Sequence, residues 1–323
     1  MKAICFEKTG NPLEVLSLRD VNIPEPGTNE IRVKVLGGTI NPADILFIQG
    51  SYRYKPEFPQ IAGLEGAGIV DATGSNVKLK KGSLVAYTVR GVWADYAIIP
   101  ENDAFVLPDN FPVEKAVQFC LNPFTAWGLL DESKARAGDW ILLTAGNSAV
   151  SKIVTQLAKL RSIRTILSVR DLKQAPELKS LGADAVLDLD DETSIAKVNE
   201  LTGGKGITAA LEAVGGKVGT NVLQCMAPFG VVLVYGLLRS DPVQFFNSQI
   251  LFKNITIKGF GMRGYVASMS PEKKQEMVQT LIREMAGPSF QLPVAHSYSF
   301  DQFREALREN EKENRNGKVL LLT

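Results

Sequence analysis

One strand–turn–helix stretch, residues 140–161, constrains the fold of this chain more than any other. It begins with an apolar run of strand length at 140–144, which small and polar residues follow. Apolar residues then return at the spacing of one helix face, as Ile153, Leu157 and Leu160. A strand, a tight turn and a helix begin a dinucleotide-binding βαβ unit, in which the helix N-terminus faces the pyrophosphate. The stretch therefore predicts a cofactor-binding turn.

The glycine pattern of this turn is incomplete. A plain G-x-G-x-x-G sequence is absent, and the three positions that would be small hold Gly146, Ala149 and Ser151. Glycines in that pattern allow a tight turn and a close approach of the backbone to the pyrophosphate. An ordinary buried connection between a strand and a helix therefore stays open as the alternative interpretation.

The chain has 323 residues, which suggests two domains, and its pattern changes along its length. Residues 1 to about 100 are rich in strands separated by Gly and Pro, as in a barrel or sandwich. From residue 140, strands and helices alternate, which predicts a doubly wound parallel sheet and an α/β fold. We predict a nucleotide-binding domain at 122–265, inserted in a discontinuous β-rich domain at 1–121 and 266–323. The crevice at the carboxyl ends of the parallel strands is the expected ligand site.

The predicted elements follow from these two patterns. In the β-rich part, strands are expected at 15–21, 30–36, 66–70, 83–89 and 94–99. In the nucleotide-binding part, strands are expected at 140–144, 164–169, 184–187, 208–213, 230–235 and 250–260. Helices are expected at 112–118, 122–130, 150–161, 173–181, 192–201, 217–226, 271–284 and 300–310, and closing strands at 294–298 and 318–322.

Composition and charge argue against several classes of function. The net charge of +1 gives no basic field for nucleic acid. No apolar run reaches the ~20 residues that span a bilayer, so no membrane partner is expected. The three cysteines lie far apart and His296 is the only histidine, so the chain is short of ligands for a classical zinc site. The N-terminus runs directly into a strand without a signal or transit segment, and we expect a cytoplasmic location.

Charged and glycine-containing tips follow the predicted strands of the nucleotide-binding domain. Arg170 stands at the tip of the second strand, where a guanidinium can clamp a 2′-phosphate, and this favours NADPH. Asp171 comes next and is an acid of the kind that binds the ribose of NAD. The alternative role for Arg170 is to form ion pairs with acidic residues on the surface. Glycines at three further tips, in 214–216, 235–238 and 259–262, let a ligand approach the backbone.

The chain resembles the zinc-free branch of the medium-chain dehydrogenase/reductase superfamily over nearly its whole length. The motifs that carry the resemblance are Asn41-Pro-Ala-Asp44, Gly63-Leu-Glu-Gly66, Asn122-Pro-Phe-Thr-Ala126, Leu181-Gly-Ala-Asp184, Val214-Gly-Gly216 and Lys318. Asn41 and Leu64 stand where the zinc-binding branch has Cys and His, so the resemblance implies that no metal is bound. It also implies a GroES-like β-rich catalytic domain and a Rossmann cofactor domain. We interpret Glu65 as a structural residue that supports the loop around Gly63 and Gly66.

Within this branch the chain is most similar to the trans-2-enoyl-thioester reductases of mitochondrial fatty-acid synthesis. The similar segments are Asn41-Pro-Ala-Asp-Ile45, Ile48-Gln-Gly-Ser-Tyr52, Pro56-Glu-Phe-Pro59, Asn147-Ser-Ala-Val150 and Ser168-Val-Arg-Asp171. The resemblance implies that Tyr52 is the catalytic tyrosine, and Tyr54 is a nearby competitor for that role. It implies NADPH contacts for Asn41, Asn122, Thr125, Asn147, Ser148, Ala149, Val150, Arg170, Asp171, Val214, Gly215, Tyr235, Gly236, Leu237, Leu238, Phe260, Gly261, Met262 and Lys318.

The implied reaction transfers a hydride from NADPH to Cβ of an enoyl thioester carried by CoA or an acyl carrier protein. Tyr52 would then donate to the enolate oxygen, because a phenol keeps its proton at neutral pH. A quinone or enone reductase and a non-enzymatic NADPH-binding protein are the alternatives. A homodimer is expected, because Val243–Ile257 is apolar enough for an edge strand to pair with a copy of itself. Three residues depart from the family pattern, and they concern pyrophosphate seating and substrate size: Ala149, Ser151 and Gly261.

Overall fold

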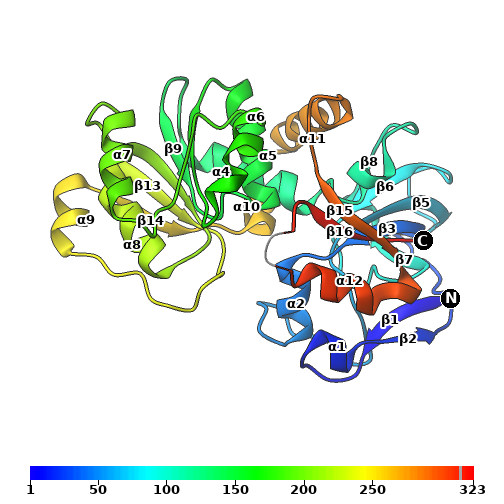
Figure 1. Ribbon diagram of the computed structural model, residues 1–323. Coiled ribbons are helices and arrows are strands. Elements are labelled where there is room, and N and C mark those ends of the chain that lie inside the picture. The colour runs from blue at the N-terminus through cyan, green and yellow to red at the C-terminus, as the bar shows by residue number, and fades with distance from the viewer. Residues whose placement is uncertain (313–314) are drawn as a thin grey trace. The chain divides into compact units, whose positions relative to one another are not determined.

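The computed structural model describes residues 1–312 and 315–323, and the contacts within the chain divide it into two units (Figure 1). Unit 1 comprises Met1–Leu121 and Val278–Thr323, and unit 2 comprises Asn122–Met277. The sequence places the second boundary at 265/266, whereas the structure places it later, inside helix α11. The GroES-like and Rossmann folds of an α/β chain, as predicted, are both present.

Unit 2 contains a six-stranded sheet in the order β11-β10-β9-β12-β13-β14, and every neighbouring pair is parallel. Its strands are β9 (Trp140–Leu143), β10 (Arg164–Ser168), β11 (Ala185–Leu187), β12 (Ile207–Glu212), β13 (Met226–Val234) and β14 (Thr256–Gly259). Counted within the unit, this is the order 3-2-1-4-5-6 of a doubly wound dinucleotide-binding sheet. The strand order reverses between β9 and β12, so the edge at which these two strands end is the expected ligand crevice.

Helices precede, connect and follow these strands, mostly at nearly the predicted positions, although the sequence predicts no helix at 247–253 or 262–268. They are α4 (Leu121–Ser133), α5 (Ala149–Leu160), α6 (Ala175–Ser180), α7 (Thr193–Leu201), α8 (Gly216–Cys225), α9 (Asn247–Lys253), α10 (Met262–Ser268) and α11 (Pro271–Ala286), which continues into unit 1. The predicted strand at 250–260 is only partly correct, because its first residues belong to α9. Asn254 adopts the left-handed conformation at φ 50° and ends this helix. A short apolar run does not distinguish a helix from a strand, which explains the error.

The core of unit 2 is built from the apolar runs that identify its strands. Leu142, Ile166 and Ala210 on three neighbouring strands are fully buried, as expected for a parallel sheet covered on both faces. Val222 and Leu223 of α8 pack into the same cluster. The same burial holds the strand ends in fixed register, and this sets the positions of the residues that follow them.

Unit 1 contains a seven-stranded mixed sheet and a three-stranded sheet of order β2-β1-β4. The strands are β1 (Lys2–Phe6), β2 (Ser17–Asp20), β3 (Glu30–Thr39), β4 (Gln60–Ile61), β5 (Gly66–Thr73), β6 (Leu84–Tyr87), β7 (Tyr96–Pro100), β8 (Ala104–Val106), β15 (Val294–Ser299) and β16 (Lys318–Leu322). The helices are α1 (Pro12–Val15), α2 (Pro42–Ile48), α3 (Val113–Ala116) and α12 (Phe303–Asn310), with 3-10 turns at η1 (Glu101–Asp103) and η3 (Phe300–Gln302). The sequence did not predict α2, which begins directly after Asn41.

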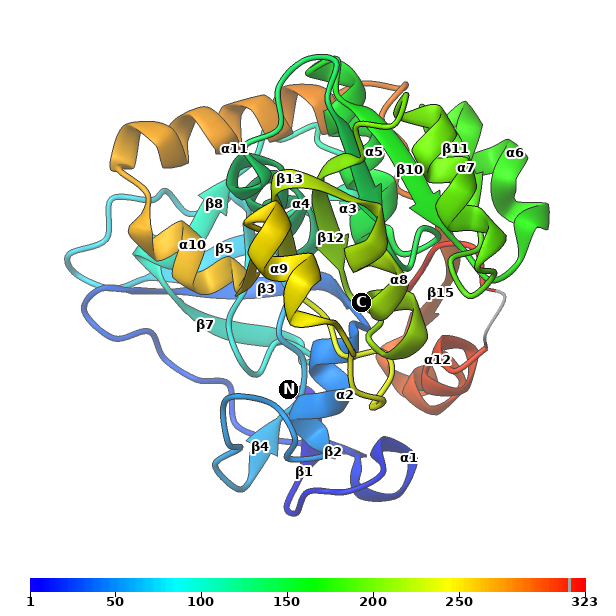
Figure 2. The ribbon, with the colours of Figure 1, turned by 90° about the vertical axis from the view of Figure 1, so that its left-hand side faces the viewer.

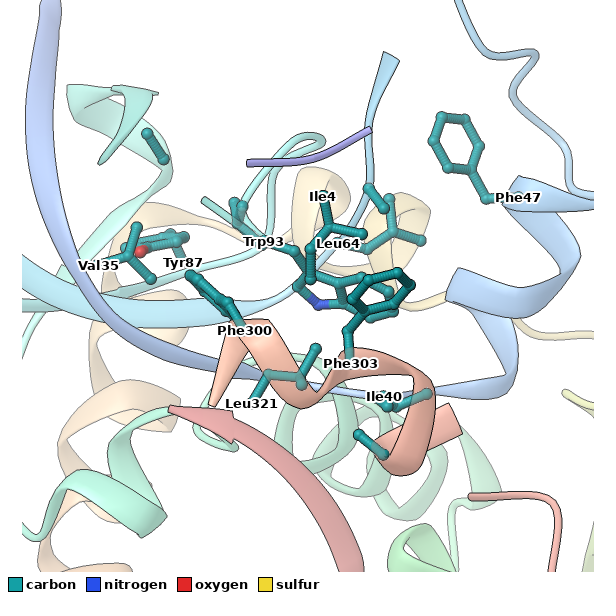
Figure 3. Close-up of a cluster of buried hydrophobic side chains, with 14 of the residues drawn as sticks. Ile4, Val35, Ile40, Phe47, Leu64, Tyr87, Trp93, Phe300, Phe303 and Leu321 are labelled. Carbon is teal, nitrogen blue, oxygen red and sulfur yellow. The ribbon is translucent and has the colours of Figure 1, made fainter. Parts of the chain in front are cut away.

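The C-terminal segment completes the fold of unit 1. Strand β16 pairs with β3 on one side and with β15 on the other, so the last strand of the chain lies inside the sheet. Phe300 and Phe303 belong to the same buried cluster as Trp93 and Leu64, in the core of the unit (Figure 3). Residues far apart in the sequence therefore share one core, which is why the β-rich unit is discontinuous.

Candidate functional site

The turn between β9 and α5 is tight enough to bring its backbone close to a ligand. The amide of Gly146 donates to the carbonyl of Ser168 at 2.8 Å. A Cβ at Gly146 would lie 2.8 Å from the Cβ of Leu167, so a larger residue does not fit there. Ala145 adopts a left-handed conformation, at φ 50°, where glycine is usual. The incomplete glycine pattern thus still forms the close strand-to-helix turn of a dinucleotide site.

The first turn of α5 offers unpaired polar groups of the kind a pyrophosphate requires. Ser148 caps the helix, because its hydroxyl accepts the amide of Ser151 at 3.2 Å. The amides of Ala149 and Val150 are the first of the helix and have no carbonyl of their own helix to bond. The Oδ1 atom of Asn147 is buried without a hydrogen-bond partner. The uncapped amides fit the pyrophosphate of NADPH, whereas the orphaned Oδ1 is an acceptor and fits a donor such as a ribose hydroxyl.

Ser151, which departs from the family's glycine, has a defined role in this turn. Its hydroxyl donates to the carbonyl of Thr144 at 3.3 Å and lies 3.1 Å from the hydroxyl of Ser148. Both serine side chains lie close to the hydroxyl of Tyr235, after β13, and burial raises the pKa of Tyr235 to about 12. Two predicted cofactor segments, the α5 turn and the β13 tip, therefore lie side by side.

Thr144 and Glu212 meet where the strand order reverses. The hydroxyl of Thr144, after β9, donates to Oε1 of Glu212 at 3.3 Å. The same oxygen accepts the amides of Val214 and Gly215 at 2.7 and 2.8 Å. Both Thr144 and Glu212 are buried. Because Gly215 has a left-handed φ of 83°, the loop needs both the glycine and the carboxyl group for its shape.

The tip of β10 presents Arg170 and Asp171 differently. Arg170 is exposed. Asp171 caps the short 3-10 helix η2 (Leu172–Gln174), because its Oδ1 accepts the amide of Lys173 at 3.0 Å. The Asp171 carboxyl group is therefore engaged in a local turn, whereas the Arg170 guanidinium is the charged group that the tip exposes. This arrangement favours a 2′-phosphate over a ribose hydroxyl.

The remaining predicted cofactor residues of unit 2 lie on α4 and on the tips of β13 and β14. Asn122 is buried in the first turn of α4, and Thr125 lies further along the same helix. The ring of Phe260 approaches α4 so closely that a Cβ at Gly128 would lie 2.6 Å from it. Gly261 is the N-cap of α10 and Met262 is its first residue. Leu237 and Leu238 are exposed, beside the half-buried Gly236.

In unit 1 the structure brings two predicted cofactor residues into direct contact. The Nζ of Lys318 donates to Oδ1 of Asn41, and both residues are buried. The Nδ2 of Asn41 donates to Oε2 of Glu65 at 3.0 Å, and its backbone amide donates to Asp44 at 2.7 Å. Burial raises the pKa of Asp44 to about 7 and lowers that of Lys318 to about 8. One lysine and two carboxyl groups thus form a single buried network.

Glu65 occupies the centre of this network, which agrees with its interpretation as structural. The hydroxyl of Thr39 donates to Oε2 of Glu65 at 2.7 Å, and the amide of Leu121 donates to Oε1 at 2.6 Å. Leu121 is the first residue of α4. The carboxyl group therefore satisfies an amide at a helix N-terminus, where no intrahelical partner exists. The raised pKa of Glu65 results from its burial.

Tyr52 lies just after α2 and differs in its surroundings from Tyr54. Tyr52 is half-buried and packs against the core of unit 1, whereas Tyr54 is exposed. The two rings meet edge to face at 5.9 Å, and the Arg53 guanidinium lies 5.6 Å from the Tyr52 ring centre. Packing on one side fixes the ring while part of it remains accessible, as a positioned donor requires.

Within residues 1–312 and 315–323, no three His, Cys, Asp or Glu side chains gather as a group that could hold a metal ion. In those same residues, no helix combines the length and apolarity needed to cross a membrane.

Sequence reasoning overlooked Thr144, Glu212 and the pair formed by Asp190 and Arg239. Glu212 had a recognisable signal, because an acid at the end of the apolar run 207–211 must find partners when it is buried. The ion pair had none, because its members are separated by 49 positions and neither belongs to a motif.

Two sequence families match the chain. Residues 27–109 match the family described as the alcohol dehydrogenase GroES-like domain. Residues 149–285 match the family described as zinc-binding dehydrogenase. Among individual relatives, the mitochondrial enoyl-[acyl-carrier-protein] reductase of Bos taurus is 34% identical, over 87% of this chain and 78% of the relative. The Homo sapiens protein of the same name is 31% identical, over 97% of this chain and 86% of the relative.

Solved structures with similar folds include both quinone and enoyl reductases. A putative NADPH:quinone reductase from Bacillus thuringiensis has a TM-score of 0.92 and 30% identity, with coverage of 100% of this chain and 98% of that one. Escherichia coli quinone oxidoreductase complexed with NADPH has a TM-score of 0.90 and 26% identity, with both chains covered completely. The Candida tropicalis heterodimer of the 2-enoyl thioester reductases Etr1p and Etr2p has a TM-score of 0.86 and 27% identity, with coverage of 100% and 99%.

Proposed function

The chain belongs to the zinc-free branch of the medium-chain dehydrogenase/reductase superfamily, where it is of the enoyl-reductase type, and we propose that it reduces the α,β double bond of an enoyl thioester. It is an NADPH-dependent oxidoreductase. The observation that carries the substrate proposal is the sequence similarity to enoyl-[acyl-carrier-protein] reductases. The alignment with the Homo sapiens protein of that name covers 97% of the present chain. The Gly-x-Tyr element that ends at Tyr52 lies within the segments that carry this similarity.

The residues of unit 2 would hold the cofactor, which supplies the hydride when it is bound. The amides at the start of α5, with Asn147 and Ser148, would bind the pyrophosphate. Arg170 would bind the 2′-phosphate through a charge-assisted fork. The Glu212 carboxyl group would act indirectly, because it shapes the loop at Val214 and Gly215 rather than facing the ligand.

Tyr52 would stabilise the charge that develops on the thioester carbonyl oxygen. Reduction at Cβ moves electrons onto that oxygen, and a donor placed there is worth about 3 kcal/mol in the transition state. A phenol hydroxyl can donate this hydrogen bond and can pass its proton on. The core contacts of Tyr52 would restrict its ring before the substrate arrives.

A substrate panel tests the function. Oxidation of NADPH is followed by stopped-flow absorbance with crotonyl-CoA, a simple quinone and a simple enone. The proposal expects crotonyl-CoA to be reduced with the highest kcat/KM, by at least about tenfold, or 1.4 kcal/mol in transition-state free energy. Preference for the quinone or the enone would contradict the enoyl-thioester assignment.

Reduction of a quinone or enone is the second candidate function. It is favoured by the fold similarity to the Bacillus thuringiensis and Escherichia coli quinone reductases. It uses the same hydride transfer but a free carbonyl instead of a thioester. Tight NADPH binding without oxidation by any member of the panel would instead favour a non-enzymatic NADPH-binding protein.

A homodimer through the outer edge of unit 2 forms part of the proposal. Strand β14 is the last strand of the sheet, so one side of its backbone is open to pairing. Phe246, Leu251 and Phe252 in and before α9 are all more than 60% exposed. Helix α9 faces the viewer in Figure 2. A second copy would cover this apolar surface.

The carrier of the acyl group and the cellular location also belong to the proposal. The name of the human relative indicates an acyl carrier protein for that protein, and a kinetic comparison of crotonyl-CoA with a crotonyl carrier protein would test that partner here. We keep the cytoplasmic location as a prediction. Fractionation of cells that produce the protein tests it, because the relatives are named mitochondrial.

A further inference from the structure

Arg239 and Asp190 form a two-bond ion pair at the carboxyl edge of the unit 2 sheet. The Nη1 and Nη2 atoms of Arg239 donate to Oδ1 and Oδ2 of Asp190 at 3.1 and 2.8 Å. Both side chains are about one-third exposed. A fork of this kind uses both carboxylate oxygens and fixes the carboxylate in one orientation, unlike an ordinary surface pair.

The pair connects two strand tips that are not neighbours in the sheet. Asp190 follows β11, and Arg239 follows β13. The segment that carries Arg239 is tied to the loop after β12, because the Arg239 amide donates to the carbonyl of Val214 at 2.8 Å. The amide of Gly216 donates to the carbonyl of Asp241 at 3.0 Å. The guanidinium therefore projects from a fixed backbone that crosses the cofactor edge.

Asp190 leaves its strand next to the strand end that carries Arg170, because β10 and β11 stay paired to their ends: the amide of Val169 donates to the carbonyl of Leu187 at 2.9 Å, and the amide of Leu189 donates to the Ser168 hydroxyl at 3.1 Å. The pKa of Asp190 is held below the usual range, first by the hydrogen bonds from Arg239 and further by the positive charges of Lys217 and Arg170. Arg170 is the residue proposed above to bind the 2′-phosphate of NADPH. A carboxylate in this position would repel that phosphate and compete with it for the Arg170 guanidinium.

We propose that Arg239 is a specificity-determining residue for NADPH, because it holds and neutralises Asp190 and so keeps that carboxylate from competing for Arg170. The inference rests on the proposed role of Arg170. NADH has no 2′-phosphate, so the state of Asp190 affects it little. Loss of Arg239 should therefore weaken NADPH binding selectively, and removal of the Asp190 charge should reverse the loss.

Fluorescence titration of the purified full-length chain with NADPH and with NADH tests this, with the ratio of the two Kd values as the readout. Arg239→Gln is expected to raise the Kd for NADPH by about tenfold, because it brings the Asp190 carboxylate and the 2′-phosphate, two like charges, into opposition. The Kd for NADH should stay within about twofold of the wild-type value. Asp190→Asn with Arg239→Gln is expected to restore the ratio to within about threefold. Arg19→Gln, which removes a surface arginine–carboxylate pair from unit 1, is the matched control and is expected to change nothing.

Two further variants separate the possible failures. Arg170→Gln should abolish the NADPH preference, and an unchanged ratio there would overturn the proposed role of Arg170. If Arg170→Gln lowers the preference for NADPH over NADH while Arg239→Gln does not, the inference about Arg239 is overturned and the proposed role of Arg170 stands. The same holds if the double variant does not regain the wild-type ratio of Kd values. Arg239→Lys keeps the positive charge but cannot make both hydrogen bonds to Asp190. This variant is used instead of Arg239→Gln if thermal unfolding shows that Arg239→Gln is misfolded. A partial loss of preference is then expected, and no loss would contradict the inference.

Discussion

The hydroxyl of Thr144 donates to the carboxyl group of Glu212 at 3.3 Å, between the two strands where the sheet reverses its order. The Thr144 hydroxyl also accepts the amide of Ala213 at 2.8 Å. One threonine and one glutamate thus satisfy three backbone amides of the loop after β12, at 213–215. The shape of this loop depends on side chains that do not themselves need to touch a ligand.

Glu212→Ala should destabilise unit 2 and weaken NADPH binding. The change leaves the amides of Val214 and Gly215 without their acceptor, which costs about 1–3 kcal/mol. Glu212→Gln keeps a carbonyl oxygen in place and should retain most of the stability and affinity. Thermal unfolding and NADPH titration measure both effects. Equal losses in the two variants would show that the charge, rather than the acceptor, matters.

Tyr87→Phe should stabilise the protein. The Tyr87 side chain is fully buried in unit 1, and its hydroxyl has no hydrogen-bond partner. Removal of an unsatisfied buried hydroxyl should therefore raise the free energy of unfolding by about 1 kcal/mol. Urea denaturation measures the change, and a lower stability of the variant would indicate a partner for the hydroxyl.

The buried carboxyl group of Asp44 should make stability depend on pH. Burial raises its pKa in the folded protein to about 7, above the usual value of 3.8. The folded state therefore binds this proton more tightly, so the stability contribution is present in acid and is lost as the pH rises from about 4 to 7. The difference in unfolding free energy between wild type and Asp44→Asn should fall by about 1 kcal/mol or more over that range. Urea denaturation at both ends of the range measures it.

Lys318 should change the stability with pH in the opposite direction. Burial lowers its pKa to about 8, so its contribution recovers only as the pH rises above that value. The two groups thus act in separate windows. A wild-type-minus-variant difference that stays constant or rises between pH 4 and 7 would contradict the assignment for Asp44.

Phe252→Asp should convert a dimer to a monomer. The Phe252 ring is 78% exposed on α9, and an aspartate there would oppose its burial against a second copy. Leu160→Ser is the matched control, since Leu160 is also exposed but ends α5, beside β10 rather than the sheet edge. Sedimentation velocity measures the oligomeric state. A wild-type protein that is monomeric at micromolar concentration would contradict the dimer.

The parallel sheet could be predicted because its strands are continuous apolar runs separated by helices with one apolar face. The turn at Gly146 was also recognisable, because its strand and helix flank it at the right spacing. Helix α2 was missed because only seven residues form it and it buries Phe47 through the tertiary fold. The helix α9 was predicted as a strand because Leu251 and Phe252 belong to a short apolar run, and such a run usually indicates a buried strand. In the structure both side chains are exposed on a helix.

The candidate site was predictable where backbone geometry determines it and was not where it depends on distant partners. Arg170 and Ser148 follow directly from their places after a strand and before a helix. The contact of Lys318 with Asn41 joins residues separated by 277 positions, and nothing local in the sequence encodes it. The same is true of Arg239 and Asp190, which only the fold brings together.

The most direct test of the central claim compares Tyr52→Phe with Tyr54→Phe, its exposed neighbour. Single-turnover oxidation of NADPH by crotonyl-CoA is measured for both variants, together with the Kd for NADPH. The account predicts that Tyr52→Phe slows reduction at least about tenfold without changing NADPH affinity, because it removes only the donor to the developing charge, while Tyr54→Phe reacts like wild type. Wild-type turnover in Tyr52→Phe would contradict it.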